Sequence, residues 1–370
     1  MNSCSWAVTP RISSVLALAL GAIAVAASPV AMLPQFEAPS SGLINPRAIV
    51  FNPATGNVYA VDTSHGAIQI YSDVSKQMHR VPVGSAPVSI AVNTANGRVY
   101  VANAGDGTVT VLDGNSDAIV ATVPIGSHPY SIAVNSATGR VYVTHTFGEQ
   151  LSIIDSTTNA ASDVKTGSSD LIAINSRTGT IYLLGYGGAV KVLDGTSQKL
   201  TERPVGKHAW GLTLSDMTGA VYVTRIESAD LAVIKSNSSN LTTLPAGAIP
   251  CAIAVDSQTN RLYVANYGGN SVSVIDATTG RKTATISVGH HPKAIAFDSI
   301  RNLVYVANTS DDTVTVINSA DNSIIATLPG GKNPYALAVV PGSSRVYVAN
   351  QADENPSTVV DFGGVQKFNP

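Results

Sequence analysis

Residues 87–126 read PVSIAVNTANGRVYVANAGDGTVTVLDGNSDAIVATVPIG, and variants of this stretch recur along most of the chain. Each copy holds runs of alternating valine, isoleucine, threonine and tyrosine, separated by short segments rich in Gly, Asn and Asp. Period-two alternation of β-branched residues predicts strands, and the segments between them predict tight hairpin turns. One full copy therefore predicts a four-stranded antiparallel sheet.

A tyrosine marks the same place in eight copies, at spacings of 41, 42, 40, 40, 41, 42 and 42 residues. A regular period of this length, with four strands per unit, predicts an all-β fold, a β-propeller of four-stranded blades. We expect the large side chain at one repeated strand position to pack between blades. The marker residues are Tyr59, Tyr100, Tyr142, Tyr182, Tyr222, Tyr263, Tyr305 and Tyr347.

The number of blades depends on how the ring closes. Seven copies have all four strand-like runs, whereas the eighth, residues 334–361, has only three. Residues 33–41 form a spare extended segment before the first copy, and this segment would complete the eighth blade. We therefore prefer eight blades, closed by N- and C-terminal strands in one blade, because closure removes open sheet edges. Seven blades with a loose C-terminus is the alternative.

The bulk composition agrees with one propeller domain over residues 33–370. Charged residues make up 12% of the chain, and 31 glycines and 19 prolines supply turns. The net charge of −2 argues against a general affinity for nucleic acid. The two cysteines are Cys4 and Cys251, so we expect no disulfide within the exported chain.

Residues 1–27 resemble a secretory signal peptide. Arg11 precedes an apolar run over residues 15–27, and small residues follow it. The run is too short to span a bilayer comfortably, so we expect cleavage and no transmembrane span in the mature chain. An uncleaved membrane anchor is the alternative. The expected location is the periplasm, the cell surface or the extracellular medium.

The repeat resembles the YVTN family of β-propeller proteins. Its tetrapeptide appears as YVAN at residues 100–103, 263–266, 305–308 and 347–350, and as YVTH and YVTR at residues 142–145 and 222–225. The resemblance implies the propeller fold over almost the whole chain after the first 27 residues. Similar proteins include surface-layer and envelope components, lactonases, nucleic-acid binders and subunits of periplasmic redox systems, so the resemblance leaves function open.

The loops point to one face of the predicted ring. We name the strands of a blade a to d, from the centre outward. The a–b turns are nearly identical between copies, whereas the b–c and d–a connections differ, and function usually resides in such variable loops. The residue that follows each Gly-x-x-Pro turn leads into strand a beside the central channel. Aromatic and cationic residues at this position are candidate contacts for a ring-shaped or anionic ligand: Arg47, Tyr130, Trp210, Lys293 and Tyr335.

Polar substitutions on the same face add further candidate ligand-binding residues. His128, His208 and His291 share one position in three preceding turns, and His145 and Arg225 replace the usual Asn at the end of strand b. We expect no metal site, because the three histidines are spread around the ring and metal ligands must converge. A packed channel mouth without ligand-binding activity is the alternative for the whole set.

The sequence favours a binding protein over an enzyme. No haem-attachment motif, nucleophile elbow, P-loop or HExxH motif occurs, and we assign no catalytic residue and no cofactor. We predict a secreted or envelope-associated scaffold, a monomer, that recognises an unknown protein, a glycan or a small anionic ligand at the channel mouth. A lactonase-like hydrolase and a single-stranded nucleic-acid binder remain alternatives.

Overall fold

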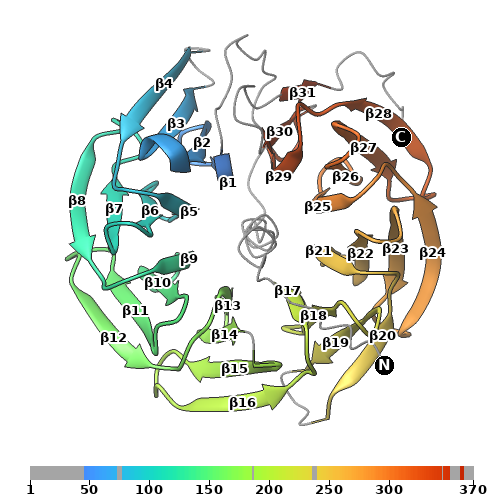
Figure 1. Ribbon diagram of the computed structural model, residues 1–370, viewed down its shortest axis with the longest axis horizontal. Coiled ribbons are helices and arrows are strands. Elements are labelled where there is room, and N and C mark those ends of the chain that lie inside the picture. Colours follow the sequence, from blue (N-terminus) through green and yellow to red (C-terminus); the bar gives the residue numbers. More distant parts are fainter. Residues whose placement is uncertain are drawn as a thin grey trace, which may run out of the picture.

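Antiparallel sheets are arranged as a ring around a central axis, as in a β-propeller (Figure 1). The computed structural model describes residues 46–72, 77–185, 187–235, 240–343, 345–350 and 359–361. Within each blade the first strand borders the centre and the last forms the outer wall. Each innermost strand contacts the innermost strand of the next blade, and β29 contacts both β25 and β1. The predicted all-β propeller with four-stranded blades is therefore confirmed.

The strand bounds follow the repeat. Blade one consists of β1 (Pro46–Asn52), β2 (Asn57–Asp62), β3 (Ala67–Ser72) and β4 (Gln77–Pro82), with a short 3-10 helix η3 (Thr63–His65). Blade two consists of β5 (Pro87–Val92), β6 (Val99–Asn103), β7 (Thr108–Leu112) and β8 (Ile119–Pro124). Blade three consists of β9 (Pro129–Asn135), β10 (Arg140–His145), β11 (Gln150–Asp155) and β12 (Ala161–Lys165). Blade four consists of β13 (Leu171–Asn175), β14 (Thr180–Leu184), β15 (Ala189–Asp194) and β16 (Leu200–Pro204).

The second half of the ring continues in the same order. Blade five consists of β17 (Ala209–Leu214), β18 (Val221–Arg225), β19 (Asp230–Ile234) and β20 (Thr242–Pro245). Blade six consists of β21 (Pro250–Asp256), β22 (Arg261–Asn266), β23 (Ser271–Asp276) and β24 (Arg281–Ser287). Blade seven consists of β25 (Pro292–Asp298), β26 (Leu303–Asn308), β27 (Thr313–Asn318) and β28 (Ile324–Pro329). The last sheet consists of β29 (Pro334–Val339), β30 (Arg345–Asn350) and β31 (Val359–Asp361).

The described residues contain seven complete four-stranded blades, which corrects the preference for eight. A three-stranded sheet, β29–β30–β31, lies between blade seven and blade one instead of a full eighth blade. The reason is that the last copy of the repeat has only three strand-like runs. The segment predicted to supply the missing strand, residues 33–41, lies outside the described residues, as does the predicted signal peptide.

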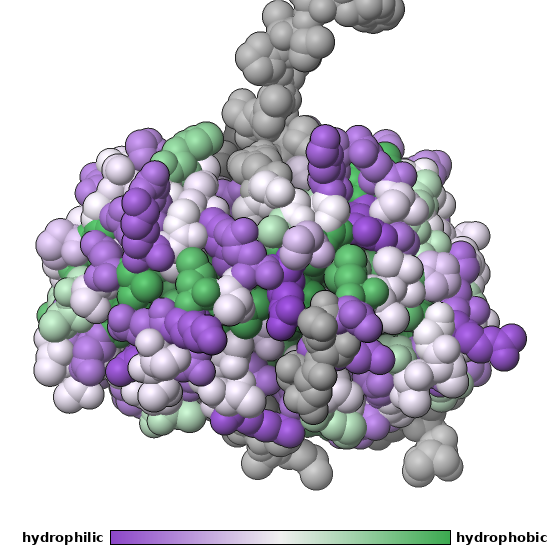
Figure 2. Space-filling model, turned by 90° about the horizontal axis from the view of Figure 1, so that it is seen from below, coloured by the Kyte–Doolittle hydropathy of each residue, from purple (hydrophilic) through white to green (hydrophobic). Residues whose placement is uncertain are grey.

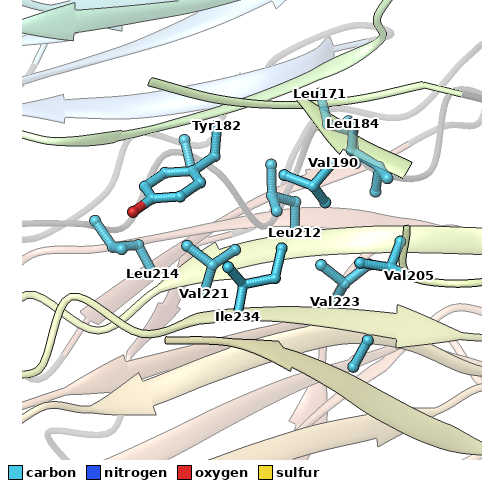
Figure 3. Close-up of a cluster of buried hydrophobic side chains, with 12 residues drawn as sticks. Leu171, Tyr182, Leu184, Val190, Val205, Leu212, Leu214, Val221, Val223 and Ile234 are labelled. Atoms are coloured by element: carbon cyan, nitrogen blue, oxygen red, sulfur yellow. The ribbon is translucent and has the colours of Figure 1, made fainter. Parts of the chain in front are cut away.

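The core lies between the blades. Figure 3 shows one such layer, in which Tyr182 and Leu184 of blade four pack against Leu212, Val221 and Val223 of blade five. All eight marker tyrosines are buried, with at most 4% of each exposed. Because they pack between sheets, they stabilise the ring and are not part of a ligand platform. Hydrophilic residues are interspersed with separate small groups of hydrophobic ones on the part of the outer wall seen in Figure 2.

Candidate functional site

The two faces of the ring carry different loops. The b–c loops and d–a turns meet on one face, which we call the variable face. There the first residue of a b–c loop donates its backbone N–H to the preceding d–a turn, as in Ile226 N to His208 O at 3.1 Å and Thr309 N to His291 O at 3.2 Å. The a–b and c–d turns meet on the opposite face, which we call the turn face. There Ser156 N donates to Gly139 O at 2.8 Å.

Side chains on the turn face hold the fold together. The aspartates that end the c strands accept hydrogen bonds from the backbone of their own turns, and these bonds lower the pKa values of Asp113, Asp155, Asp194 and Asp276. Arginines of the a–b turns donate to backbone carbonyls in the next blade: Arg98 to Ser156, Arg140 to Gly195 and Arg261 to Ser319. These polar groups are therefore engaged in turn formation and in contacts between blades.

The repeated Asn at the end of strand b is also structural. The Asn103 side-chain amide donates to the hydroxyl of Thr108 at 3.0 Å and to that of Thr110 at 2.9 Å. Asn308 makes the equivalent bonds to Thr313 and Thr315. This side chain ties the start of a b–c loop to strand c, which fixes the loop on the variable face.

His145 and Arg225 take over this task in their blades. His145 is fully buried, its Nε2 lies 2.8 Å from Ser152 Oγ, and its Nδ1 lies 2.8 Å from Ser127 O. The Arg225 side chain is 16% exposed and forms an ion pair with Asp230, with Nε donating to Oδ1 at 2.6 Å. Arg225 also donates to Val205 O at 3.1 Å. The geometry therefore gives these two candidate ligand contacts a role within the loop framework.

The residues that follow the d–a turns pack against the next blade. Tyr335 is 1% exposed, and Lys293, which is 8% exposed, places Nζ 4.6 Å from the centre of the Tyr335 ring. Burial lowers the pKa of Lys293. Cys251 occupies the equivalent position in blade six. It is buried, and its thiol donates a hydrogen bond to Pro292 O at 3.2 Å. Burial raises the pKa of the Cys251 thiol to about 12, so it is not an activated nucleophile.

Trp210 and Tyr130 remain half-buried. Trp210 packs against the buried hydrophobic cluster of blades six and seven that contains Cys251. The side chain of Arg47 lies outside the described residues. Of the aromatic and cationic set, the described structure therefore leaves Trp210 and Tyr130 partly accessible, whereas Lys293 and Tyr335 form a buried pair beneath the surface.

The three turn histidines lie in different blades and make separate contacts. His128 is exposed. His208 is exposed and lies 2.8 Å from Glu227, measured from Nδ1 to Oε1. His291 stacks on Tyr267 with ring centres 4.5 Å apart and lies 2.6 Å from the Ser310 hydroxyl. No group of three or more His, Cys, Asp or Glu side chains in the described part of the chain is placed to hold a metal ion.

Sequence reasoning missed Asp170. It stands where most copies have the Pro of the d–a turn, and it is 8% exposed. Its Oδ1 accepts a hydrogen bond from Thr146 Oγ1 at 3.0 Å, and burial raises the pKa of the carboxyl. The available signal was the replacement of the turn proline by an acidic residue in the fourth copy.

Sequence reasoning also missed Phe147. Its side chain is 82% exposed and its backbone has φ 64, in the left-handed region. An aromatic residue in this conformation is strained, which marks the blade-three loop as a departure from the repeat.

Comparison with solved structures supports the fold. The chain is similar to a structure titled Kuenenia stuttgartiensis Hydrazine Synthase, with a TM-score of 0.60 and 17% sequence identity, covering 79% of this chain and 99% of that chain. At this identity the likeness shows the β-propeller fold alone. No protein-family model matches the chain, and no curated protein matches it in sequence. Among the residues that the structure describes, none forms a helix long and apolar enough to cross a membrane.

Proposed function

We propose that this protein is a binding scaffold that recognises a partner or ligand on its variable face. The observation that carries the proposal is that the polar side chains of the two faces make different kinds of contact. Repeated polar residues on the turn face are engaged in their own turns or in contacts to the next blade. His128, Phe147 and His208 are exposed, depart from the repeat and lie on the variable face.

The accessible part of this surface follows the d–a turns and the b–c loops beside them. Trp210 and Tyr130 offer partly exposed aromatic surface, and aromatic residues of this kind often carry a large share of binding energy. Buried Lys293 adds positive charge below the surface and is held against Tyr335. We propose that these residues support recognition, with His145 and Arg225 fixing the loops that present them.

Three finer proposals accompany the function. We propose that the chain belongs among YVTN repeat proteins, because the tetrapeptide recurs at the end of strand b. We propose that residues 33–41 add a fourth strand to the sheet of β29–β31, which has an open outer edge among the described residues. We also propose export with removal of residues 1–27, which would place the protein in the periplasm, on the cell surface or outside the cell.

Site-specific photo-crosslinking in the native host tests the binding face. A benzoylphenylalanine at His128 or Ile249 samples the variable face, and the same residue at Asn115 or Thr278 samples the turn face. We expect adducts with a recurrent partner from the variable-face positions and none from the turn-face positions. Adducts from the turn face alone, or from neither face, would contradict the proposal.

A further inference from the structure

Two d–a turns bind, through the same backbone N–H, a carboxylate that the protein itself supplies. In blade seven, Asp311 Oδ2 accepts the backbone N–H of His290 at 2.7 Å, and Asp311 Oδ1 lies 2.8 Å from His290 Nδ1. In blade two, Asp106 accepts the backbone N–H of Ser85 in the same way. The carboxylate comes in each case from the residue three positions after the Asn of strand b. The d–a turn is thus a carboxylate-binding site on the variable face, with its backbone N–H as the hydrogen-bond donor.

Blade five reproduces the backbone of this site. In its b–c loop the Ile226 N–H donates a hydrogen bond to His208 O, as the Thr309 N–H donates to His291 O in blade seven. The loop closes with Ala246 N donating to Ala229 O at 3.1 Å, as Gly330 N donates to Asp312 O at 2.8 Å in blade seven. The equivalent loop residues also share a positive backbone angle, φ 54 at Ala229 and φ 58 at Asp312.

The internal carboxylate is absent from blade five. Ser228 occupies the position of Asp311, and its hydroxyl donates to Asp230 Oδ1 at 2.6 Å. Lys207 replaces His290, and its side chain is exposed. The two acids of residues 226–230, at the blade-five b–c loop, are already engaged, because Glu227 pairs with His208 and Asp230 pairs with Arg225. The turn therefore keeps the Lys207 N–H and adds a cation, and among the described residues no carboxylate accepts a hydrogen bond from that N–H.

We propose that the blade-five turn, residues 206–208, binds a carboxylate of the ligand, with the Lys207 backbone N–H as hydrogen-bond donor and the Lys207 ammonium as counter-charge. A charge-assisted bond of this kind is stronger than a neutral one. The ligand class is a carboxylate-bearing molecule, which covers an acidic side chain, a peptide C-terminus and a free dicarboxylate. This inference rests on the proposed function and names the chemistry of its ligand.

The test uses the full chain labelled with [15N]lysine, and succinate as the probe. The Lys207 amide signal is assigned by its disappearance in Lys207→Arg. We expect this signal to shift saturably with succinate and to stay in place with succinamide, which has the same shape without charge. Separate titrations with Ac-Ala-Glu-Ala-amide and with Ac-Ala-Ala-Ala, which has a free C-terminus, show which carboxylate source binds most tightly.

Ser228→Asp supplies the missing carboxylate within the chain. We expect it to move the Lys207 amide signal toward its bound position without probe and to weaken succinate binding at least tenfold. Thr278→Asp adds the same charge on the turn face and should leave succinate binding unchanged. Lys207→Gln, observed by Trp210 fluorescence, should weaken binding several-fold.

Three results would overturn the carboxylate site: no saturable shift at Lys207, an equal response to succinamide, or full succinate binding in Ser228→Asp. The proposed function fails separately. Photo-crosslinked adducts from the variable face together with an unresponsive Lys207 would reject only the carboxylate site. Adducts from the turn face alone would reject the assignment of partner binding to the variable face.

Discussion

Replacing the Arg225–Asp230 pair by the residues of the ordinary repeat tests whether Arg225 is structural. Blade two has Asn103 and Thr108 at these positions, joined by a hydrogen bond of 3.0 Å. Arg225→Asn leaves the Asp230 carboxylate without its cation, and Asp230→Thr leaves a guanidinium that is 16% exposed without its anion. The double variant, Arg225→Asn with Asp230→Thr, restores the pair found in blade two.

The magnitude follows from the contacts. The pair joins two partly buried side chains by two charge-assisted hydrogen bonds, and hydrogen bonds to charged groups contribute about 1.5–3 kcal/mol each. Because both side chains keep some contact with water, we expect each single variant to lose about 2 kcal/mol of unfolding free energy. The double variant regains one of the two amide–hydroxyl bonds of blade two, since Ala232 offers no hydroxyl. It should lie within about 1 kcal/mol of the unmodified protein.

Urea-induced unfolding, followed by circular dichroism, gives the three free-energy changes and their coupling. We expect a coupling energy of about 3 kcal/mol, because the two single losses of about 2 kcal/mol shrink to at most about 1 kcal/mol in the double variant. Additive effects, with a coupling below about 0.5 kcal/mol, would refute the structural assignment and return Arg225 to the set of ligand contacts.

Three further predictions concern single residues. Asp170→Asn should raise the melting temperature at pH 7 but not at a pH below 3.8, the ordinary pKa of Asp. Burial raises the pKa of Asp170, so its ionisation destabilises the folded protein as the pH rises. An unchanged melting temperature at pH 7 would contradict this. Cys251 should react with iodoacetamide only after unfolding, as located by mass spectrometry, since it is buried with a pKa raised to about 12; rapid labelling of the native protein would disprove its burial. Arg98→Met should lower the unfolding free energy by about 1–2 kcal/mol through loss of its bond to Ser156, with Arg281→Met on the outer strand β24 as a control that changes little.

The period of the tyrosines predicted the fold well, because every blade must place one large side chain between sheets. The strands and the engagement of the c-strand aspartates in their own turns were also predictable, since both depend on local sequence. The blade count was predicted less well, because the last copy supplies only three strands and a complete eighth blade would require residues 33–41, which lie outside the described residues.

The side-chain contacts of the candidate residues were predicted less well than the fold. Sequence reasoning treated His145 and Arg225 as departures with functional meaning, but each carries compensating partners, Ser152 and Asp230, several residues away. Lys293 and Tyr335 follow a turn beside the channel, yet their side chains are buried toward the neighbouring blade. Such contacts depend on the orientation of side chains between blades, which a repeat position alone does not fix.

The most direct test of the central claim compares the two faces in intact cells of the host and in the purified protein. Diethyl pyrocarbonate labels His128 and His208 on the variable face, and carbodiimide coupling labels Asp113 and Asp276 on the turn face, with buried His145 as an internal control. We predict that the two histidines are protected in cells relative to the purified protein, while the two aspartates are labelled equally in both. Protection of the aspartates with full labelling of the histidines would contradict the assignment of binding to the variable face.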